Sequence, residues 1–320
     1  TYTKKEDVIM QKDPMFYKSW RSGTLTNGIE RAAHRALLYS TGLEEEDLHK
    51  PLIAIVNSYT EMVPGHIHLN ELARYVAQGV WEAGGVPREF STIAICDGIC
   101  QGHKGMSYPL PSRELIADSI EYMIEAHQFD AMVLMPGCDK IVPGMLMGAM
   151  RCNIPAIVVP GGPMLPGKSK EFPMLTLTDM RELIGRTQTG KMTVEDLMAA
   201  EQTALPGYGT CSMLGTANTM GCLAEVLGMS LPGCGLAPAV SSKKRRICKQ
   251  SGRRIIEMLK ENLPPRRIMT REALRNGIMI SMAMGASTNS TLHLPAIAHE
   301  GGIDISLDDF DELSRKVPYI

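Results

Sequence analysis

The sequence predicts an α/β fold: a doubly wound, mostly parallel sheet flanked by helices, with a helix-rich second half. Two observations support it. Short apolar runs alternate with helical patterns between residues 51 and 160, and the patterns beyond residue 170 are mostly helical. With 44% hydrophobic and 21% charged residues, the composition is that of a folded protein, which argues against intrinsic disorder.

Four short apolar runs are the expected strands. They cover Leu52–Val56, Thr92–Ile95, Ala131–Met135 and Ala156–Val159. Continuous apolar runs of this length are typical of parallel strands that are buried on both faces. The sequence therefore predicts four strands joined by helical crossovers.

Helical periodicity fills the intervals between these runs. His68–Ala83 places its leucines and valines on one face and stops at Gly84-Gly85, while further helices are expected over Ser112–His127 and Gly144–Cys152. A short basic cluster, Lys243–Arg246, is expected on a solvated helix face. The helices predicted beyond residue 170 cover residues 179–187, 193–204, 213–228, 250–262, 270–284 and 289–300.

The charge balance excludes several functional classes. Lys and Arg number 33 against 35 Asp and Glu, which argues against a nucleic-acid or anionic membrane partner. No apolar run approaches the roughly 18 residues of a membrane span, and the N-terminus lacks the apolar stretch of a signal peptide. The eight cysteines include no Cys-x-x-Cys pair, so neither a zinc ribbon nor a disulfide framework is expected. We therefore expect a cytoplasmic globular protein.

Chemically versatile residues follow the predicted strands. Asp97 follows the second, and Cys138, Asp139 and Lys140 follow the third. In open parallel sheets, ligands bind outside the carboxyl ends of the strands. Carboxylate oxygens suit Mg²⁺ and thiolates suit iron–sulfur clusters. Each residue alone also has an ordinary explanation, a turn at Asp97-Gly98 or core packing at Cys138, so a metal site and a structural role both stay open.

At these same positions the sequence resembles the dihydroxy-acid and sugar-acid dehydratase family. The resemblance runs in order along the chain from about residue 20 to residue 318. The segments that carry it are Asn57–Leu69, Cys96–Tyr108, Ser112–Ser119, Gly137–Leu146, Gly209–Met220, Gly285–Leu294 and Leu313–Pro318.

The resemblance implies an iron–sulfur hydro-lyase that removes water from a 2,3-dihydroxy-3-methyl carboxylic acid and leaves a 2-keto acid, a step of valine and isoleucine synthesis. By motif, Cys138 and Cys211 would be cluster ligands. Asp97, Asp139 and Lys140 would form the Mg²⁺ site, with a lysine that is often carbamylated in the family. A homodimer is also implied.

The resemblance also implies a division into domains. Residues 1–35 would be an N-terminal arm and residues 36–320 the α/β domain that carries the iron–sulfur and Mg²⁺ ligands. The family's base, a serine, belongs to a C-terminal domain that this chain does not contain, so no catalytic residue is expected within it. Ser287 and Thr288 are the expected substrate-binding residues here.

Several positions depart from the family pattern. Family members with a [2Fe–2S] cluster have a cysteine where this chain has Gly65, which favours a [4Fe–4S] cluster and leaves its third protein ligand open. Cys100 is one candidate. Tyr208 and Ala286 replace a common cysteine and a usual glycine, and this leaves the substrate open between the branched-chain precursor and a sugar acid.

Two other functions remain as alternatives. One is a sugar-acid (aldonate) dehydratase of the same family. The other is a truncated paralogue without catalytic activity, acting as a binding or regulatory subunit. Retention of Asp97, Cys138, Asp139, Lys140 and Cys211 argues against the second alternative, because a retired site need not keep all of them.

Overall fold

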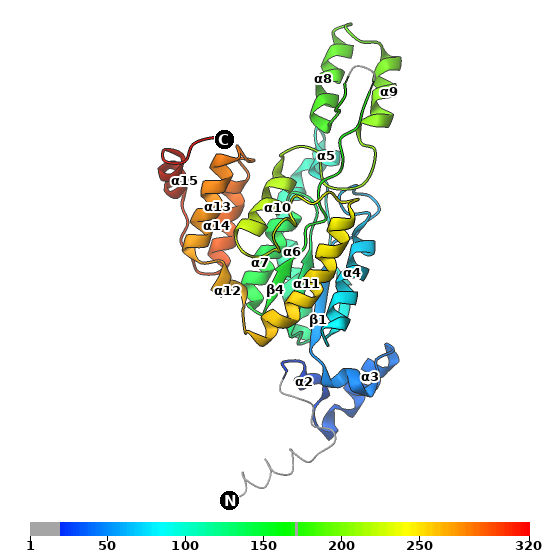
Figure 1. Ribbon diagram of the computed structural model, residues 1–320, viewed down its shortest axis with the longest axis vertical. Coiled ribbons are helices and arrows are strands. Elements are labelled where there is room, and N and C mark those ends of the chain that lie inside the picture. Colours follow the sequence, from blue (N-terminus) through cyan, green and yellow to red (C-terminus); the bar gives the residue numbers. More distant parts are fainter. Residues whose placement is uncertain (1–19, 170–171) are drawn as a thin grey trace, which may run out of the picture.

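A computed structural model of the chain describes residues 20–169 and 172–320. It confirms the predicted fold class: a parallel four-stranded sheet in the order β2-β1-β3-β4, with helices on both faces (Figure 1). The first 19 residues of the predicted N-terminal arm lie outside the described part. Within that part, no helix is long and apolar enough to cross a membrane.

Three of the four predicted strands are confirmed to within a residue, and the second was misplaced. The strands are β1 (Leu52–Asn57), β2 (Val86–Ser91), β3 (Ala131–Met135) and β4 (Ala156–Val158). The apolar run Thr92–Ile95 lies beyond the end of β2, in a loop. Since β2 is an edge strand paired only with β1, its second half is partly exposed and carries charged residues. Such a strand has no continuous apolar run, and Pro87 is tolerated there.

The predicted helices are also present, with some shifted bounds. The helix expected at 250–262 begins earlier, at Ser242, and a further helix near the end of the chain was not predicted. The α-helices are α2 (Gly23–Thr26), α3 (Ala32–Ser40), α4 (Leu69–Glu82), α5 (Asp97–Cys100), α6 (Pro109–Ala126), α7 (Ile141–Cys152), α8 (Leu177–Gln188), α9 (Val194–Ala204), α10 (Thr216–Val226), α11 (Ser242–Lys260), α12 (Pro265–Ile268), α13 (Arg271–Ala283), α14 (Ser290–Glu300) and α15 (Leu307–Ser314). Short 3-10 helices are η1 (Ile29–Arg31), η2 (Glu45–His49) and η3 (Lys104–Ser107).

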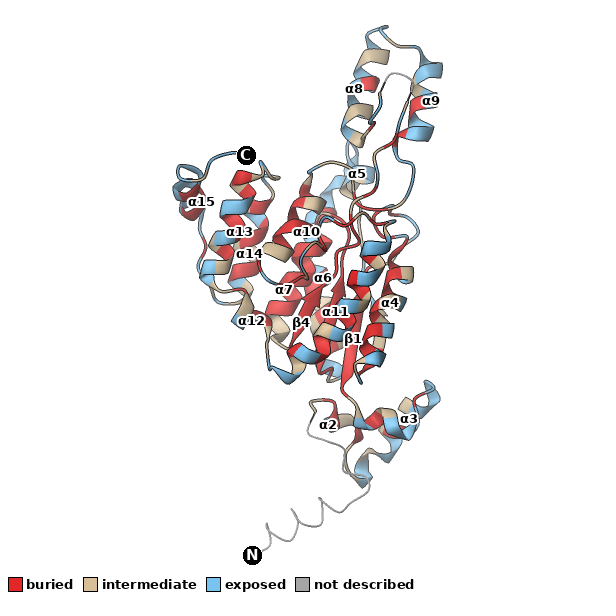
Figure 2. Ribbon diagram, in the orientation of Figure 1, coloured by how far each residue is buried: buried red, intermediate tan, exposed pale blue. Residues whose placement is uncertain are grey.

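Alternate side chains of the central strands enter two separate apolar cores. Ile53 and Ile55 of β1 pack against α4 and α11, whereas Ala54 and Val56 pack against α6 and α7. All four are buried, as is the whole interior of the sheet (Figure 2). Helices α10, α13 and α14 extend the second core outward from α7. The continuous apolar runs seen in the sequence thus reflect burial on both faces.

The basic cluster at the start of α11 is only partly solvated. The prediction of a solvated helix face is therefore wrong for Lys244. This side chain is fully buried, and its ammonium group donates hydrogen bonds to the carbonyl oxygens of Pro160, at 2.8 Å, and Cys234. Both carbonyls belong to loops, where no strand or helix partner satisfies them. Because buried carbonyls need a donor, one cation of a basic run can turn inward.

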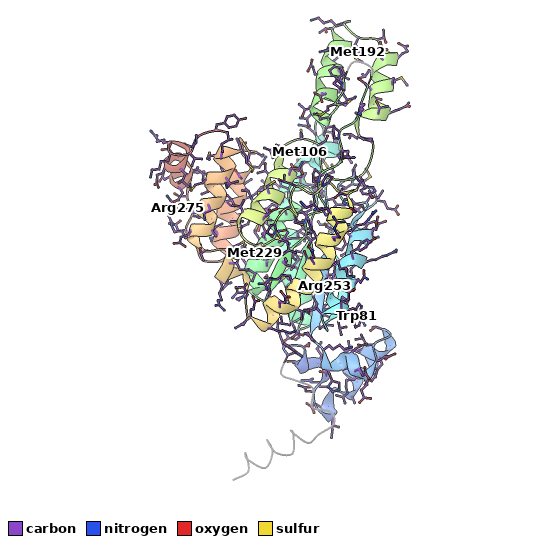
Figure 3. All side chains as sticks on the ribbon, viewed as in Figure 1. Trp81, Met106, Met192, Met229, Arg253 and Arg275 are labelled. Atoms are coloured by element: carbon purple, nitrogen blue, oxygen red, sulfur yellow. The ribbon has the colours of Figure 1, made fainter. Side chains whose placement is uncertain are left out.

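Helices α8 and α9 project together beyond the carboxyl edge of the sheet (Figure 1). They hold each other through a small apolar core of their own that includes Leu183, Ala200 and Ala204. Thr176 and Thr193 cap their first turns by accepting hydrogen bonds from backbone N–H groups. Met192 marks this pair in Figure 3, well separated from Met106 at the edge of the sheet.

Candidate metal centre

The sheet brings two Cys-Asp pairs to one edge. Cys96-Asp97 follows β2 and Cys138-Asp139 follows β3, on either side of the end of β1. A cavity of about 200 Å³ opens there, between this edge and the first turn of α8. Polar residues that line it include Asp97, Asp139, Lys140, Arg181, Asn218 and Asn289.

Asp97 and Lys140 form a buried ion pair in this cavity. The ammonium nitrogen of Lys140 lies 2.7 Å from Oδ2 of Asp97, and the two side chains are only 7% and 12% exposed. The other carboxylate oxygen of Asp97 is buried and has no hydrogen-bond partner. A buried carboxylate oxygen without a partner costs free energy, so this atom is suited to bind a cation.

Asp139 points to the beginning of α10, close to Asp97. Its carboxylate accepts hydrogen bonds from the Thr216 side chain and the backbone N–H of Ala217. Burial raises the pKa of Asp139, and the neighbouring negative charge of Asp97 raises it further. Two carboxylates held close together in a cavity repel each other unless a cation lies between them.

The backbone of Cys138 is held by a histidine from the loop after β1. Nε2 of the buried His66 accepts a hydrogen bond from the Cys138 N–H at 2.8 Å, and Nδ1 lies 2.8 Å from the carbonyl oxygen of Ser58. His66 is therefore neutral and protonated on Nδ1. Burial lowers the pKa of His66 to about 4.

Gly137 allows this close approach. A Cβ atom at this position would lie 2.6 Å from both the carbonyl oxygen of Gly65 and Nε2 of His66. Both distances are shorter than van der Waals contact, so only glycine fits here. The G-C-D-K segment thus needs its glycine to place Cys138.

Cys211 reaches the site from the loop before α10. The Thr210 N–H donates to the carbonyl oxygen of Gly162 at 2.9 Å, and the side-chain amide of Asn218 donates to the carbonyl oxygens of Cys211 and Met213. Burial raises the pKa of the Cys211 thiol to about 11. Binding as a thiolate therefore requires a cation that replaces the proton.

A third thiol lies in the same place. The Cys138 thiol donates a hydrogen bond to the sulfur of Cys96, which is the main reason that the pKa of Cys96 is lowered to about 6 and that of Cys138 is raised. Backbone N–H groups of Gly98 and Ile99 also donate to the Cys96 sulfur. Sequence reasoning missed Cys96, although one signal was available: the Cys-Asp pair occurs at the ends of two strands.

The structure brings all five predicted metal ligands together. The predicted substrate-binding residues, Ser287 and Thr288, are not among the described residues that line the cavity. The hydroxyl of Ser287 contacts that of Thr216 at 3.0 Å, and Thr288 is exposed. Among the described residues, their neighbour Asn289 lines the cavity. Its amide donates to both Thr216 and Ser287, at 3.0 and 3.1 Å.

Of the positions that depart from the family pattern, Gly65 lies at the centre. A Cβ atom on Gly65 would lie 3.0 Å from the Cys138 sulfur, so this glycine is directly beside the thiols. Tyr208 stacks on His68 with ring centroids 4.7 Å apart. Cys100 lies at the opposite end of α5 from Asp97, and it is not among the described residues that line the cavity.

The donors fit a soft and a hard metal group side by side. Thiols of Cys96, Cys138 and Cys211 lie next to the carboxylates of Asp97 and Asp139, one of which has an oxygen without a partner. Across residues 20–169 and 172–320, no three His, Cys, Asp or Glu side chains lie close enough to surround a single metal ion. A bound group would therefore have to bridge separate side chains.

Comparisons with known proteins agree with this chemistry. The family described as "Dihydroxy-acid/6-phosphogluconate dehydratase N-terminal" matches residues 50–320. The fold and the site define an α/β protein whose sheet gathers thiols and carboxylates at one edge, and this chain belongs to that dehydratase family.

Curated relatives bear the name dihydroxy-acid dehydratase. One from Halothermothrix orenii is 55% identical over 299 residues, covering 93% of this chain and 54% of the relative. Another from Methanothermobacter thermautotrophicus is 56% identical over 301 residues, covering 94% and 55%. The chain thus spans about half the length of the curated relatives that it matches.

Proposed function

We propose that this chain is the metal-binding part of a dihydroxy-acid dehydratase, a hydro-lyase that converts a 2,3-dihydroxy-3-methyl carboxylic acid into a 2-keto acid for branched-chain amino acid synthesis. One observation carries the proposal. The five ligands expected from the family motifs come from loops far apart in the sequence. Asp97, Asp139, Lys140 and Cys211 line one cavity, and the buried Cys138 lies close to Asp139 and Cys211. The names of the relatives support the same reaction.

The chain would hold two metal groups. Cys138 and Cys211 would hold an iron–sulfur cluster, which would supply Lewis acid chemistry for the departing hydroxyl. Asp97, Asp139 and Lys140 would hold Mg²⁺; for Lys140 this requires loss of its positive charge, as in a carbamate. We prefer a [4Fe–4S] to a [2Fe–2S] cluster because family members with a [2Fe–2S] cluster have a cysteine at the position of Gly65, which lies beside Cys138.

The cavity suits a small hydroxy acid. Its lining combines the cation Arg181 with the amides of Asn218 and Asn289, and it also includes the apolar Leu177 and Met213. A guanidinium group can bind a carboxylate through paired hydrogen bonds, and amides can bind hydroxyl groups. These residues would orient the substrate so that its hydroxyl groups face the acidic edge.

Activity with two substrate classes tests the proposal. The chain is joined to the C-terminal part of the Halothermothrix orenii relative, which this chain does not cover, and is loaded with iron, sulfide and Mg²⁺. The protein is then supplied with 2,3-dihydroxy-3-methylbutanoate, and the 2-keto acid is measured as its hydrazone. We expect turnover of this substrate to exceed that of pentonates and hexonates by at least tenfold. Faster turnover of the sugar acids would support the sugar-acid dehydratase instead, and activity with neither would favour a paralogue without catalytic function.

Four further expectations from the sequence stay predictions. They are a homodimer, a cytoplasmic location, an arm formed by residues 1–35, and a base serine in a C-terminal domain. Light scattering of the purified protein would test the first: a mass of about twice the 35.0 kDa chain is expected.

A further inference from the structure

We propose that Cys96 is the third protein ligand of the iron–sulfur cluster. The inference rests on the proposed function, which assigns Cys138 and Cys211 to that cluster. From the sequence, Cys100 was the candidate for this ligand. We propose Cys96 in its place because Cys96 lies next to Cys138 and Cys211 in the fold.

The topology places Cys96 opposite Cys138. Strands β2 and β3 both pair with β1, so the segments that leave their carboxyl ends pass on either side of the end of β1. Each segment delivers a cysteine followed directly by an aspartate. The aspartates, Asp97 and Asp139, already share one cavity, so the cysteines before them face one another as well.

The sulfur atoms themselves make contact. Cys96 and Cys138 are within hydrogen-bonding distance, and Cys211 is close enough to interact electrostatically with both. Backbone N–H groups of Gly98 and Ile99 donate to the Cys96 sulfur. N–H donors of this kind stabilise thiolates and the sulfur atoms of iron–sulfur clusters.

The remaining cysteines are placed elsewhere in the described structure. Cys100 does not occur among the charged or hydrogen-bonded neighbours of Cys138 and Cys211. Cys234 and Cys248 belong to the core between the sheet and α11, on its other face. Cys152 ends α7 and Cys222 lies within α10. Only the Cys96 thiol joins the other two.

Three thiolates explain why Gly65 can replace a cysteine. A [4Fe–4S] cluster usually takes four cysteine ligands, one for each iron. Cys96, Cys138 and Cys211 would leave one iron without a protein ligand, and such an open position is what Lewis acid chemistry requires. The small Gly65 beside Cys138 leaves space for the cluster on that side.

Differential alkylation tests the assignment without any mutation. Protein with and without a reconstituted cluster is treated briefly with iodoacetamide under argon, and the modified cysteines are identified by mass spectrometry. We expect Cys96 to be modified in the apoprotein and protected at least tenfold by the cluster, whereas Cys100 reacts equally in both. Equal modification of Cys96 in both forms would overturn the inference.

Variants provide a second readout. Cys96→Ser is compared with Cys100→Ser by iron and acid-labile sulfide per chain, with circular dichroism of the apoproteins to show that both fold. We expect Cys96→Ser to hold less than one-tenth of the wild-type iron and Cys100→Ser to hold all of it. If Cys96→Ser holds as much iron as the wild type, the inference about Cys96 is wrong but the proposed function still stands. If the wild-type protein never binds iron, both the inference and the proposed function are wrong.

Discussion

His66 connects the loop after β1 to the backbone of Cys138 and therefore controls where that thiol lies. We expect His66→Phe, which keeps the ring but removes the acceptor, to leave the buried Cys138 N–H unpaired. The cost should be about 1 to 3 kcal/mol of unfolding free energy, with reduced iron binding. Chemical denaturation measures the first effect. The exposed His127→Phe is the matched control, and an equal midpoint for both variants would contradict this role.

The neutral buried histidines make stability depend on pH. Burial lowers the pKa of His66 to about 4 and that of His293 to about 3, below the value of about 6.5 in the unfolded chain. Since the folded pKa values are depressed, this contribution to stability is complete above pH 6.5 and is lost as the pH falls towards 4.

Unfolding of the apoprotein across this range measures the effect. The free energy of unfolding should fall by up to about 1.4 kcal/mol per pH unit for each histidine. Asp130 and Asp139 have raised pKa values and act in the opposite direction, so the wild type is compared with His66→Phe. The variant should show a shallower decline between pH 6 and 4. Parallel curves would contradict the assignment to His66.

Helices α4 and α11 pack backbone to backbone through two glycines. A Cβ atom on Gly79 would lie 2.0 Å from the carbonyl oxygen of Lys249, and one on Gly252 would lie 2.2 Å from that of Val76. Alanine at either position would force the helices apart, and α11 would then pull away from the sheet. The close approach thus depends on the absence of two side chains.

Gly79→Ala should therefore destabilise the protein, although alanine favours helices. Overpacking of this kind costs about 1 to 3 kcal/mol. Gly185 is also within a helix, but nothing lies within 4 Å of a Cβ atom there, so Gly185→Ala should stabilise α8 by up to about 1 kcal/mol. Thermal unfolding of both variants measures the contrast, and a shift of the same sign in both would refute it.

Among the secondary-structure elements, the sequence pattern identifies the strands that are buried on both faces. Strands β1, β3 and β4 are continuous apolar runs because helices cover both faces. Strand β2 pairs on one side only, so its sequence carries Arg88 and Glu89, and an apolar loop beside it gave the stronger signal. The burial of Lys244 could not be predicted from the sequence either, because the carbonyl oxygens that accept its hydrogen bonds belong to other segments of the chain.

Asp130 ties the segment before β1 to the rest of the molecule. Its buried carboxylate accepts hydrogen bonds from the backbone N–H and hydroxyl of Ser22, at 2.9 and 2.7 Å, and from the Leu52 N–H at 2.7 Å. This group joins residues 20–50 to the beginning of both β1 and β3. The segment has few other anchors of this kind in the described structure.

We expect Asp130→Ala to release this segment. Three buried donors would lose their acceptor, which costs about 1 to 3 kcal/mol for each donor that stays unpaired. Limited proteolysis should then cut within residues 20–50 much faster than in the wild type. The exposed Asp304→Ala serves as control, and unchanged cleavage of Asp130→Ala would contradict the anchoring role.

For the whole molecule, the residues proposed as metal ligands could be predicted from motifs shared with the dehydratase family, and most of them follow strand ends, where parallel sheets bind their ligands. Asp97, Asp139, Lys140 and Cys211 line one cavity, and Cys138 lies close to two of them. Cys96 also follows a strand, but its contact with Cys138 depends on the path of the loop after β2, so the repeated Cys-Asp pair alone does not show that the two thiols meet. The contributions of Arg181 and Asn289 depend on how separate helices pack.

The iron and acid-labile sulfide content of the protein, measured after strictly anaerobic purification and reconstitution, tests the central claim most directly. The account predicts about four of each per chain, since it assigns a [4Fe–4S] cluster. It also predicts that Cys138→Ser binds almost none. A wild-type chain without iron and sulfide, or a Cys138→Ser variant with full iron content, would contradict the assignment of this strand edge as the metal centre.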